Sequence, residues 1–235
     1  MPSLNGKTIL EKNLPKLIAA SNNPKNNICE IIIVDDGSWD DSVSYLNQNF
    51  KGKIKLIKHT KNRGFSASVN TGVRATSGDL LLLINIDVIP EINFLESSLP
   101  LFENKKLFAV SLHEKGYGSA KGYFGDGYIQ LAMGEENDKT HPSFYVSGGS
   151  GLFRKSIWKE LGGMDEKLLS PFYWEDIDLC FRALKRGYIN FWEPNGNVVH
   201  HHESTISKFP KKYVGRIKER NQLLVIWKNI HSTTL

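Results

Sequence analysis

Apolar residues along the first half of the chain fall into two alternating patterns. Short continuous apolar runs are typical of strands that are buried on both faces. Runs of this kind lie at residues 30–35, 80–84 and 107–111, and a segment that alternates apolar and polar residues lies at 53–58. Between them, apolar side chains recur at helical spacing over residues 40–50, 66–75 and 93–102. Strands that alternate with helices of this length predict βαβ units and a mostly parallel central sheet flanked by helices.

The second half of the chain is less regular. Residues 113–145 are rich in Gly, Tyr and Phe and predict loops or short antiparallel strands. Helical spacing returns in three later segments, at residues 154–161, 175–186 and 210–229, and two short strands are predicted at 188–192 and 197–200. The pattern therefore indicates an α/β chain whose two halves differ in kind.

The first residues interrupt the alternation. Thr8 and Glu11 form a capping-box pattern that opens a helix, and Pro15 inside that helix should kink it or delay its start. Before the helix stands only Pro-Ser-Leu-Asn-Gly at residues 2–6, where a βαβ chain normally has a strand. We therefore predict that the first strand is missing.

Length and composition are those of a globular protein. The chain has 235 residues, 40% of them hydrophobic and 23% charged, and its two cysteines are too few for a disulfide scaffold or a zinc module. No run approaches the roughly 20 apolar residues that span a bilayer, and no signal peptide opens the chain. We expect a cytoplasmic protein with one domain over residues 1–205, divided into halves 1–111 and 112–205, and a basic amphipathic helix over 206–235.

The net charge of +5 has an uneven distribution. Residues 204–235 carry seven basic side chains and one acidic one, a charge of +6, so the first 203 residues sum to −1. A basic tail on a nearly neutral domain argues against nucleic acid as a partner. The tail helix either packs on the domain or lies on the inner face of a membrane, where its Lys and Arg would meet anionic lipid.

Three acidic groups stand where chemistry is expected in an open α/β sheet, whose ligands bind beyond the carboxyl ends of the strands. Asp35–Asp36 and Asp87 follow predicted strands, and Glu175–Asp176 opens a predicted helix. Carboxylates grouped with histidine suit Mg²⁺ or Mn²⁺. Of the three histidines at 200–202, we favour His200 and then His202 as ligands. Each group also has a plainer interpretation, as a turn acid or as a first-turn acid that the helix dipole favours.

The order and spacing of these groups resemble those of the family 2 glycosyltransferases. The first half carries Asp-Asp-Gly-Ser at 35–38, Asn-Arg-Gly-Phe at 62–65, Asn-Thr-Gly at 70–72 and Asn-Ile-Asp at 85–87. The second half carries Gly-Gly at 148–149, Leu-Gly-Gly-Met-Asp-Glu at 161–166, Trp-Glu-Asp-Ile-Asp at 174–178 and Val-Val-His at 198–200. The resemblance covers about residues 3–230. Arg-Asn-x-Leu-Leu-x-x-Trp-Lys at 220–228 is similar to a segment of the rhamnosyltransferase-like branch.

The resemblance implies a GT-A fold and assigns roles to particular residues. Asp35 or Asp36 would contact the base or ribose, with Asn62, Gly64, Asn85 and Ile86 also on the nucleotide sugar. Asp87 would hold Mg²⁺ or Mn²⁺ on the diphosphate, together with His200 or His202, because Asn85 replaces the first acid of the Asp-x-Asp motif. Asp176 matches the general base. Glu175, Gly148, Gly149 and Trp174 would meet the acceptor, although Trp174 could equally be a core residue.

The implied activity is an inverting transfer from a UDP-, dTDP- or GDP-linked sugar to a glycan or lipid-linked acceptor in surface polysaccharide synthesis. Family members open with a strand before the turn at residues 2–5, so we expect this chain to be an N-terminally shortened form. The alternative is a degenerate fold that binds nucleotide sugar weakly without turnover. A sugar nucleotidyltransferase is disfavoured, since no Gly-rich loop with Arg and Lys follows the first strand.

Overall fold

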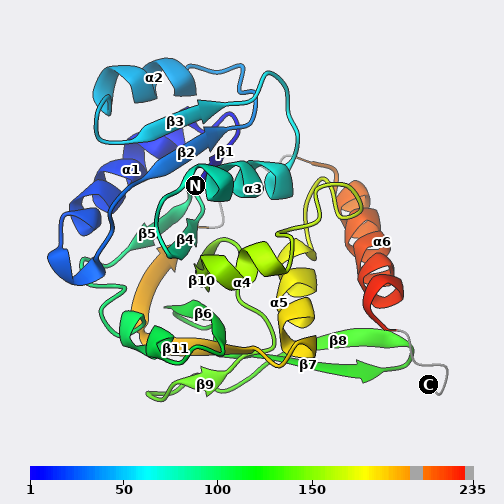
Figure 1. Cartoon of the computed structure of the whole chain (residues 1–235). Helices are drawn as coiled ribbons and strands as arrows, with labels where there is room; N and C mark the ends of the chain where they lie inside the picture. Colours follow the sequence, from blue (N-terminus) through cyan, green and yellow to red (C-terminus); the bar gives the residue numbers. More distant parts are fainter. Residues whose placement is uncertain (202–208, 231–235) are drawn as a thin grey trace.

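A parallel sheet forms the first part of the molecule in the computed structural model, which describes residues 1–201 and 209–230. Its strands lie in the order β1 (Pro2–Ser3), β2 (Ile32–Asp35) and β3 (Lys55–Lys58). Helices α1 (Lys7–Ser21) and α2 (Ser42–Asn49) connect these strands, and α3 (Phe65–Ala75) follows the last of them (Figure 1). The predicted alternation of strands and helices is confirmed here.

Strand β1 corrects the prediction that no strand precedes the first helix. Pro2 and Ser3 pair in parallel with Val34 and Asp35, and Val34 N donates to Met1 O at 3.0 Å. The strand is short because only the residues before Asn5, which adopts a left-handed φ of 50°, run beside β2. Beyond Met1, an apolar cavity of about 140 Å³ lies between residues of β2 and those of β4 (Leu80–Ile84).

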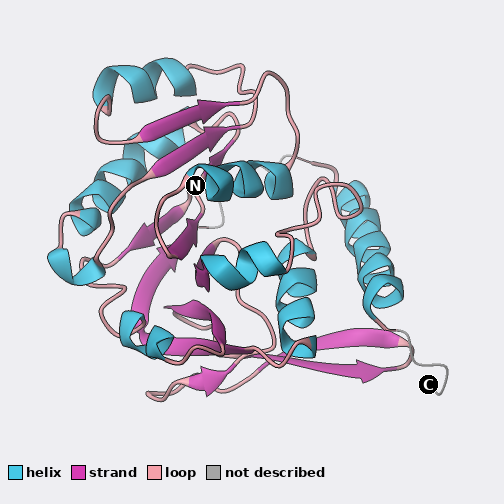
Figure 2. Ribbon diagram, in the orientation of Figure 1, coloured by secondary structure: helices cyan, strands magenta, loops and turns pink. Residues whose placement is uncertain are grey.

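A second, mixed sheet occupies the centre of the molecule (Figure 2). Its main path runs β4, β10 (Ser150–Arg154), β6 (Leu107–Glu114), β11 (Ile189–His200) and β5 (Val88–Pro90), and β9 (His141–Pro142) pairs with β11. Only β6 and β11 pair in parallel; the other pairs are antiparallel. The expectation of a mostly parallel sheet therefore holds for the first sheet and is wrong for this one.

Proline and glycine explain where helices depart from the prediction. Residues 93–102 form turns and a short 3-10 helix, η2 (Leu99–Glu103), in place of an α-helix. Pro100 lacks an amide hydrogen and disfavours the helical conformation of the residue before it. At α1 the capping residue is Gly6, not Thr8; Gly6 N donates to Ser42 Oγ and Lys7 N to Asp40 Oδ2. Pro15 lies inside α1, which continues through it.

The later elements surround one side of the second sheet. Strands β7 (Ala120–Gly125) and β8 (Tyr128–Met133) form the antiparallel hairpin that the 113–145 segment allowed. Helices α4 (Lys155–Glu160) and α5 (Glu175–Lys185) follow, and the two predicted strands at 188–192 and 197–200 are a single strand, β11, with an irregularity between Glu193 and Asn197.

Helix α6 (Lys211–Asn229) packs against the rest of the molecule. It stands beside α5 and contacts β8 (Figure 1), and Val225 and Ile226 join Trp174 and Ile177 in one apolar cluster. A buried ion network adds to this contact, since Lys228 Nζ lies 3.0 Å from Asp178 Oδ2 and Asn229 Nδ2 donates to Asp178 Oδ1 at 2.8 Å. No helix within the described ranges is long and apolar enough to cross a membrane.

Candidate active site

A pocket of about 290 Å³ lies where the two halves of the chain meet. It collects most of the residues that the sequence singled out, from segments far apart along the chain. Those that line it are Asp36, Asn62, Gly64, Asn85, Ile86, Asp87, Gly148, Gly149, Glu175 and Asp176. These residues come from the carboxyl ends of β2 and β4, the loop after β3, the turn before β10 and the start of α5, and strand ends of this kind are the expected ligand site of an α/β sheet.

Asp36 and Asp35 differ in what their carboxylates contact. Asp36 accepts from the backbone amides of Arg63 (2.9 Å) and Gly64 (2.8 Å), and its Oδ1 lies 2.7 Å from His59 Nδ1. The carboxylate thus fixes the 62–64 loop at the edge of the pocket. Asp35 is buried, does not line the pocket and accepts from Ser38 N at 3.0 Å. Of the two acids, Asp36 is the one at the pocket.

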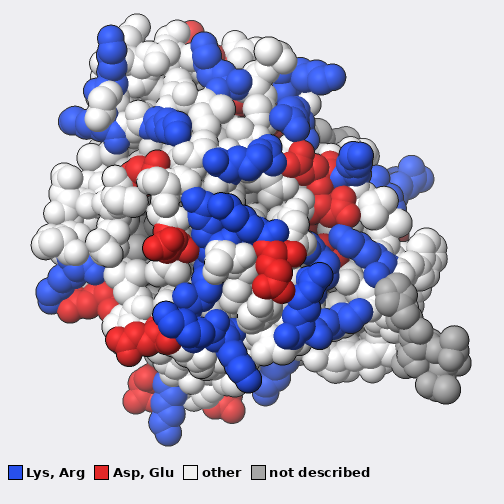
Figure 3. Space-filling view, viewed as in Figure 1, with Lys and Arg blue, Asp and Glu red and all other residues white. Residues whose placement is uncertain are grey.

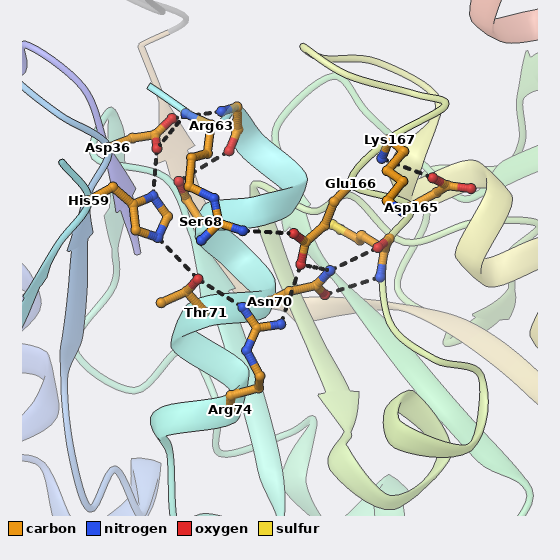
Figure 4. A network of polar contacts seen from close by, with 12 residues as sticks. Asp36, His59, Arg63, Ser68, Asn70, Thr71, Arg74, Asp165, Glu166 and Lys167 are labelled. Atoms are coloured by element: carbon orange, nitrogen blue, oxygen red, sulfur yellow. Dashed lines mark hydrogen bonds and ion pairs between the residues drawn. The ribbon is translucent and has the colours of Figure 1, made fainter. Parts of the chain in front are cut away.

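A polar network behind Asp36 joins the two halves (Figure 4). His59 Nε2 lies 3.1 Å from Thr71 Oγ1, to which Arg74 donates, and Arg74 and Arg63 both pair with Glu166. Asn70 exchanges hydrogen bonds with the backbone of Met164 (Figure 4). Sequence reasoning did not assign these side chains, although Asn70 and Glu166 stand inside the motifs quoted for the resemblance.

Asp87 has one oxygen engaged and one without a partner. Its Oδ1 lies 3.2 Å from His200 Nε2, while the buried Oδ2 has no hydrogen-bond partner among the described residues. His200 Nδ1 lies 3.4 Å from Glu114 Oε2. Burial acts to lower the pKa of His200, but its contacts with Asp87 and Glu114 outweigh that effect and raise it.

This arrangement fits a divalent cation. An unpartnered buried carboxylate oxygen costs free energy that a cation would recover, and a carboxylate with an imidazole is a donor set that Mn²⁺ and Mg²⁺ accept. Over residues 1–201 and 209–230, no three His, Cys, Asp or Glu side chains converge on a complete metal site. His202, the second favoured ligand, lies outside the described residues.

The start of α5 brings Glu175 and Asp176 to the pocket. Asp176 accepts from Gly148 N at 3.1 Å and from Ile177 N at 2.8 Å, and Glu175 Oε2 is buried without a partner in the described part of the chain. Burial raises the pKa of Asp176; burial, followed by the charge of Asp176, raises the pKa of Glu175 well above its ordinary value. Carboxyls with raised pKa values in a cleft are typical of proton transfer.

Glycine is required where the 147–149 turn passes Asn85. A Cβ on Gly149 would stand 2.7 Å from Asn85 Nδ2, and one on Gly148 would stand 3.2 Å from Met164 Cε. Asn85 N also donates to Gly149 O at 2.9 Å. The two glycines therefore let this turn approach both Asn85 and Asp176, to which Gly148 donates.

Trp174 is not at the pocket. Its side chain is buried in the cluster that includes Ile177 and Val225, so the core alternative describes its position. The neighbouring Phe172 and Tyr173 line the pocket instead. Tyr173 and Trp174 both have left-handed φ angles, 72° and 73°, and this turn of the backbone sends consecutive side chains in directions that the sequence pattern does not show.

Comparison with solved structures shows the fold. A crystal structure of GalNAc-T7 with UDP, GalNAc and Mn²⁺ superposes with a TM-score of 0.73 at 15% identity, over 96% of this chain and 46% of the other. The fold is that of the GT-A glycosyltransferases, as the sequence predicted.

The sequence comparisons identify the family. Residues 1–162 match the model of glycosyl transferase family 2, and the chain belongs to that family. A pre-mycofactocin glycosyltransferase of Mycobacterium tuberculosis is 29% identical over 185 residues, 75% of this chain and 38% of that protein. An N-acetylglucosaminyl-diphospho-decaprenol L-rhamnosyltransferase of the same species is 32% identical over 73 residues, 31% of this chain and 23% of that protein. The chain thus spans well under half the length of these relatives.

Proposed function

We propose that this glycosyltransferase is an inverting enzyme that transfers a sugar from a UDP-, dTDP- or GDP-linked donor to a hydroxyl of a glycan or lipid-linked acceptor in surface polysaccharide synthesis. One observation carries the proposal. A single pocket is lined by Asp36 and Asp87, from the first half of the chain, and by Asp176 from the second. Inversion needs a base on the side of the sugar opposite the leaving diphosphate, and carboxylates from the two halves of the chain at one pocket could serve the diphosphate and the acceptor separately.

The donor would lie between the 62–64 loop and the 85–87 turn. Asp36 holds the amides of Arg63 and Gly64, so this loop offers a rigid wall for the nucleoside, with Asn62 at its exposed end. Asp87 and His200 would hold Mn²⁺ or Mg²⁺, and the unpartnered Oδ2 of Asp87 supports this. The ion would neutralise the departing diphosphate. The GalNAc-T7 structure, which holds UDP and Mn²⁺, adds support for a metal-dependent donor site.

Asp176 would act as the general base. Its carboxylate takes the proton of the acceptor hydroxyl while that oxygen forms a bond to the anomeric carbon, and the bond from that carbon to the diphosphate breaks. The amide of Gly148 holds Asp176 Oδ2 in place at 3.1 Å. Glu175, Gly148 and Gly149 would border the acceptor together with the aromatic rings of Phe172 and Tyr173, which offer apolar faces to a sugar ring.

A peripheral membrane contact through α6 is a further part of the proposal. The exposed side of this helix carries Lys212 and Arg216, and Trp227 is 68% exposed. Basic side chains and an exposed indole on one helix suit an anionic membrane surface. On the face drawn in Figure 3, basic side chains are interspersed with acidic ones, so any such contact would depend on α6 rather than on the face as a whole.

The direct test measures nucleoside diphosphate release by the full chain with Mn²⁺ and a panel of UDP-, dTDP- and GDP-sugars, and the anomeric configuration of the product. Release by the wild type, lost on chelation, with an inverted product, would support the proposal. Metal-dependent donor binding without release would favour the degenerate alternative. Absence of binding to every donor would contradict a nucleotide-sugar function.

A further inference from the structure

The segment that leads into Glu175 and Asp176 has no regular secondary structure of its own. Residues 169–173 pass between α4 and α5, and the segment ends with Tyr173 and Trp174 in the left-handed region. Side chains other than glycine rarely adopt this conformation, so surrounding contacts must maintain it. Because Phe172, Tyr173, Glu175 and Asp176 all line the pocket, the path of this segment decides where the carboxyls of the pocket lie.

Two adjacent residues of α6 bind the carbonyls of this segment. Asn221 is fully buried, and its Nδ2 lies within hydrogen-bond distance of the carbonyl oxygens of Leu169 (2.9 Å), Phe172 (3.0 Å) and Tyr173 (2.9 Å), which share its two hydrogens. Arg220 donates to the carbonyl of Ser170. The remaining carbonyl, that of Pro171, accepts from Phe65 N at 3.3 Å, at the start of α3. All five carbonyls of residues 169–173 are therefore held, four of them by α6.

Arg220 also fixes the orientation of the Asn221 amide. Its Nε and Nη2 donate to Asn221 Oδ1 at 2.9 and 2.8 Å. With Oδ1 occupied by the guanidinium, Nδ2 must face the three carbonyls. An aspartate at this position would offer no donor and would turn a negative oxygen toward the carbonyls. The chemistry of the site therefore calls for an amide at 221 beside a guanidinium at 220.

We propose that Arg220 and Asn221 are positioning residues for the transfer reaction, holding the 169–173 segment so that Asp176 faces the acceptor. This inference rests on the proposed function, since it acts through the assigned base. A purely structural role, in which the pair only docks α6, is the competing explanation. The helix has other docking contacts, among them Asn229 on Asp178 and the apolar cluster around Val225, so the two roles can be separated.

Asn229→Ala is the matched control for Asn221→Ala. Both are buried asparagines on one face of α6, and both donate through Nδ2 to an element of the second half. Asn229 contacts a side chain of α5 rather than the 169–173 carbonyls. Arg220→Ala is a second test variant; residue 220 is exposed, so this variant should fold even if Asn221→Ala does not.

The experiment compares the full-length variants by two measurements. The first is nucleoside diphosphate release with Mn²⁺ and the donor panel, separated into kcat and donor Kd. The second is hydrogen exchange of the backbone amides in residues 168–178. We expect Asn221→Ala and Arg220→Ala to lower kcat by about 10- to 100-fold with donor Kd within about twofold, because small misplacements of a reacting group have effects of this size. Exchange should increase over residues 168–178 in both variants and not in Asn229→Ala.

Two outcomes would overturn the inference. In the first, Asn221→Ala and Arg220→Ala show the same hydrogen exchange over residues 168–178 as Asn229→Ala. In the second, these variants fold and have the same kcat as Asn229→Ala. Failure of the proposed function gives a different result. If Asp176→Asn retains the wild-type rate, the base assignment is wrong, yet the exchange of residues 168–178 still decides whether Arg220 and Asn221 hold this segment.

Discussion

The two sides of the pocket hold their carboxylates in opposite ways. On the side of the parallel sheet, Asp36 accepts two backbone amides and contacts His59, so its charge is satisfied by the protein itself. On the side of α5, Glu175 and Asp176 are desolvated neighbours, and the pKa of each is raised. A carboxylate whose oxygens are hydrogen-bonded by the protein fixes the position of a loop, whereas a desolvated carboxylate with a raised pKa is suited to exchange a proton. The difference indicates a binding side and a reactive side.

The largest effect is expected at the reactive side. Asp176→Asn keeps the size and the hydrogen bond from Gly148 N, but removes the group that accepts the proton. Transfer should fall by about 10²–10⁴-fold, the usual contribution of a general base, with donor affinity unchanged. Steady-state kinetics and calorimetry on the same preparation check both parts. Undiminished turnover would show that the base lies elsewhere.

Asp87 should be the next most sensitive position. Asp87→Ala removes the carboxylate whose Oδ2 lacks a partner, so Mn²⁺-dependent binding of a nucleoside diphosphate should weaken by at least about 10- to 100-fold, the range found even for residues one step removed from a metal. Calorimetry with and without Mn²⁺ measures this. Equal affinity in both conditions, for wild type and variant alike, would mean that the pocket holds no metal.

His59→Ala tests the binding side. The substitution leaves Thr71 and one oxygen of the buried Asp36 without the imidazole, at a cost of about 1–3 kcal/mol of folding stability. The Arg63 and Gly64 amides should then be held less firmly, and donor binding should weaken more than kcat. His141→Ala, a substitution of a histidine that does not line the pocket, is the control. An effect on kcat alone would contradict the separation of the two sides.

The raised pKa values predict opposite pH trends for rate and stability. A base must be deprotonated, so the rate should rise with pH through a midpoint above that of an ordinary aspartate. Folding, by contrast, favours the protonated carboxyls, so their contribution to stability is lost as pH rises through the folded pKa values. Glu175→Gln should therefore raise Tm at neutral pH, by roughly 2–4 °C per kcal/mol relieved. Melting curves from pH 5 to 8 check the trend; a Tm gain confined to low pH would contradict it.

The smallest effect is expected at the exposed face of α6. Replacing Lys212 and Arg216 by Ser should weaken binding to anionic vesicles by about 1 kcal/mol for each charge removed. Co-sedimentation with vesicles with and without phosphatidylserine measures this, and substitution of Lys25 and Lys51, in the first half, is the matched control. Binding that ignores both lipid charge and salt would exclude an electrostatic contact.

The sequence predicts where helices and strands lie better than how the strands pair, because the position of an element depends on local information. The apolar run at 80–84 matches β4 to the residue, and helical spacing locates α3 within one residue. In the second sheet, strand partners come from distant segments, and an apolar run does not indicate whether its neighbour will be parallel. Residues 99–103 are an exception, because the prediction of a helix over 93–102 relied on apolar spacing and gave too little weight to Pro100, and the structure has a 3-10 helix there.

The same distinction applies to the site. Residues within motifs, such as Asp36, Asp87 and Asp176, could be placed at one pocket from their order along the chain. Trp174 could not, because its left-handed backbone turns the side chain into the core. His59 carries no signal in the sequence that separates it from ordinary polar residues, and Asn221 stands in the segment at 220–228 that carries the resemblance but received no role from it. Their importance comes from contacts with segments 23 and about 50 residues away.

The attachment of residues 169–173 to α6 has a consequence for synthesis. A chain emerges from the ribosome beginning at its N-terminus, so the first sheet, with Asp36 and the 62–64 loop, can form while the rest is still being made. The 169–173 carbonyls, however, have to wait for partners at positions 220 and 221. The contacts of the first half would therefore form first, and competence for transfer would come only after residues 220 and 221 have been made.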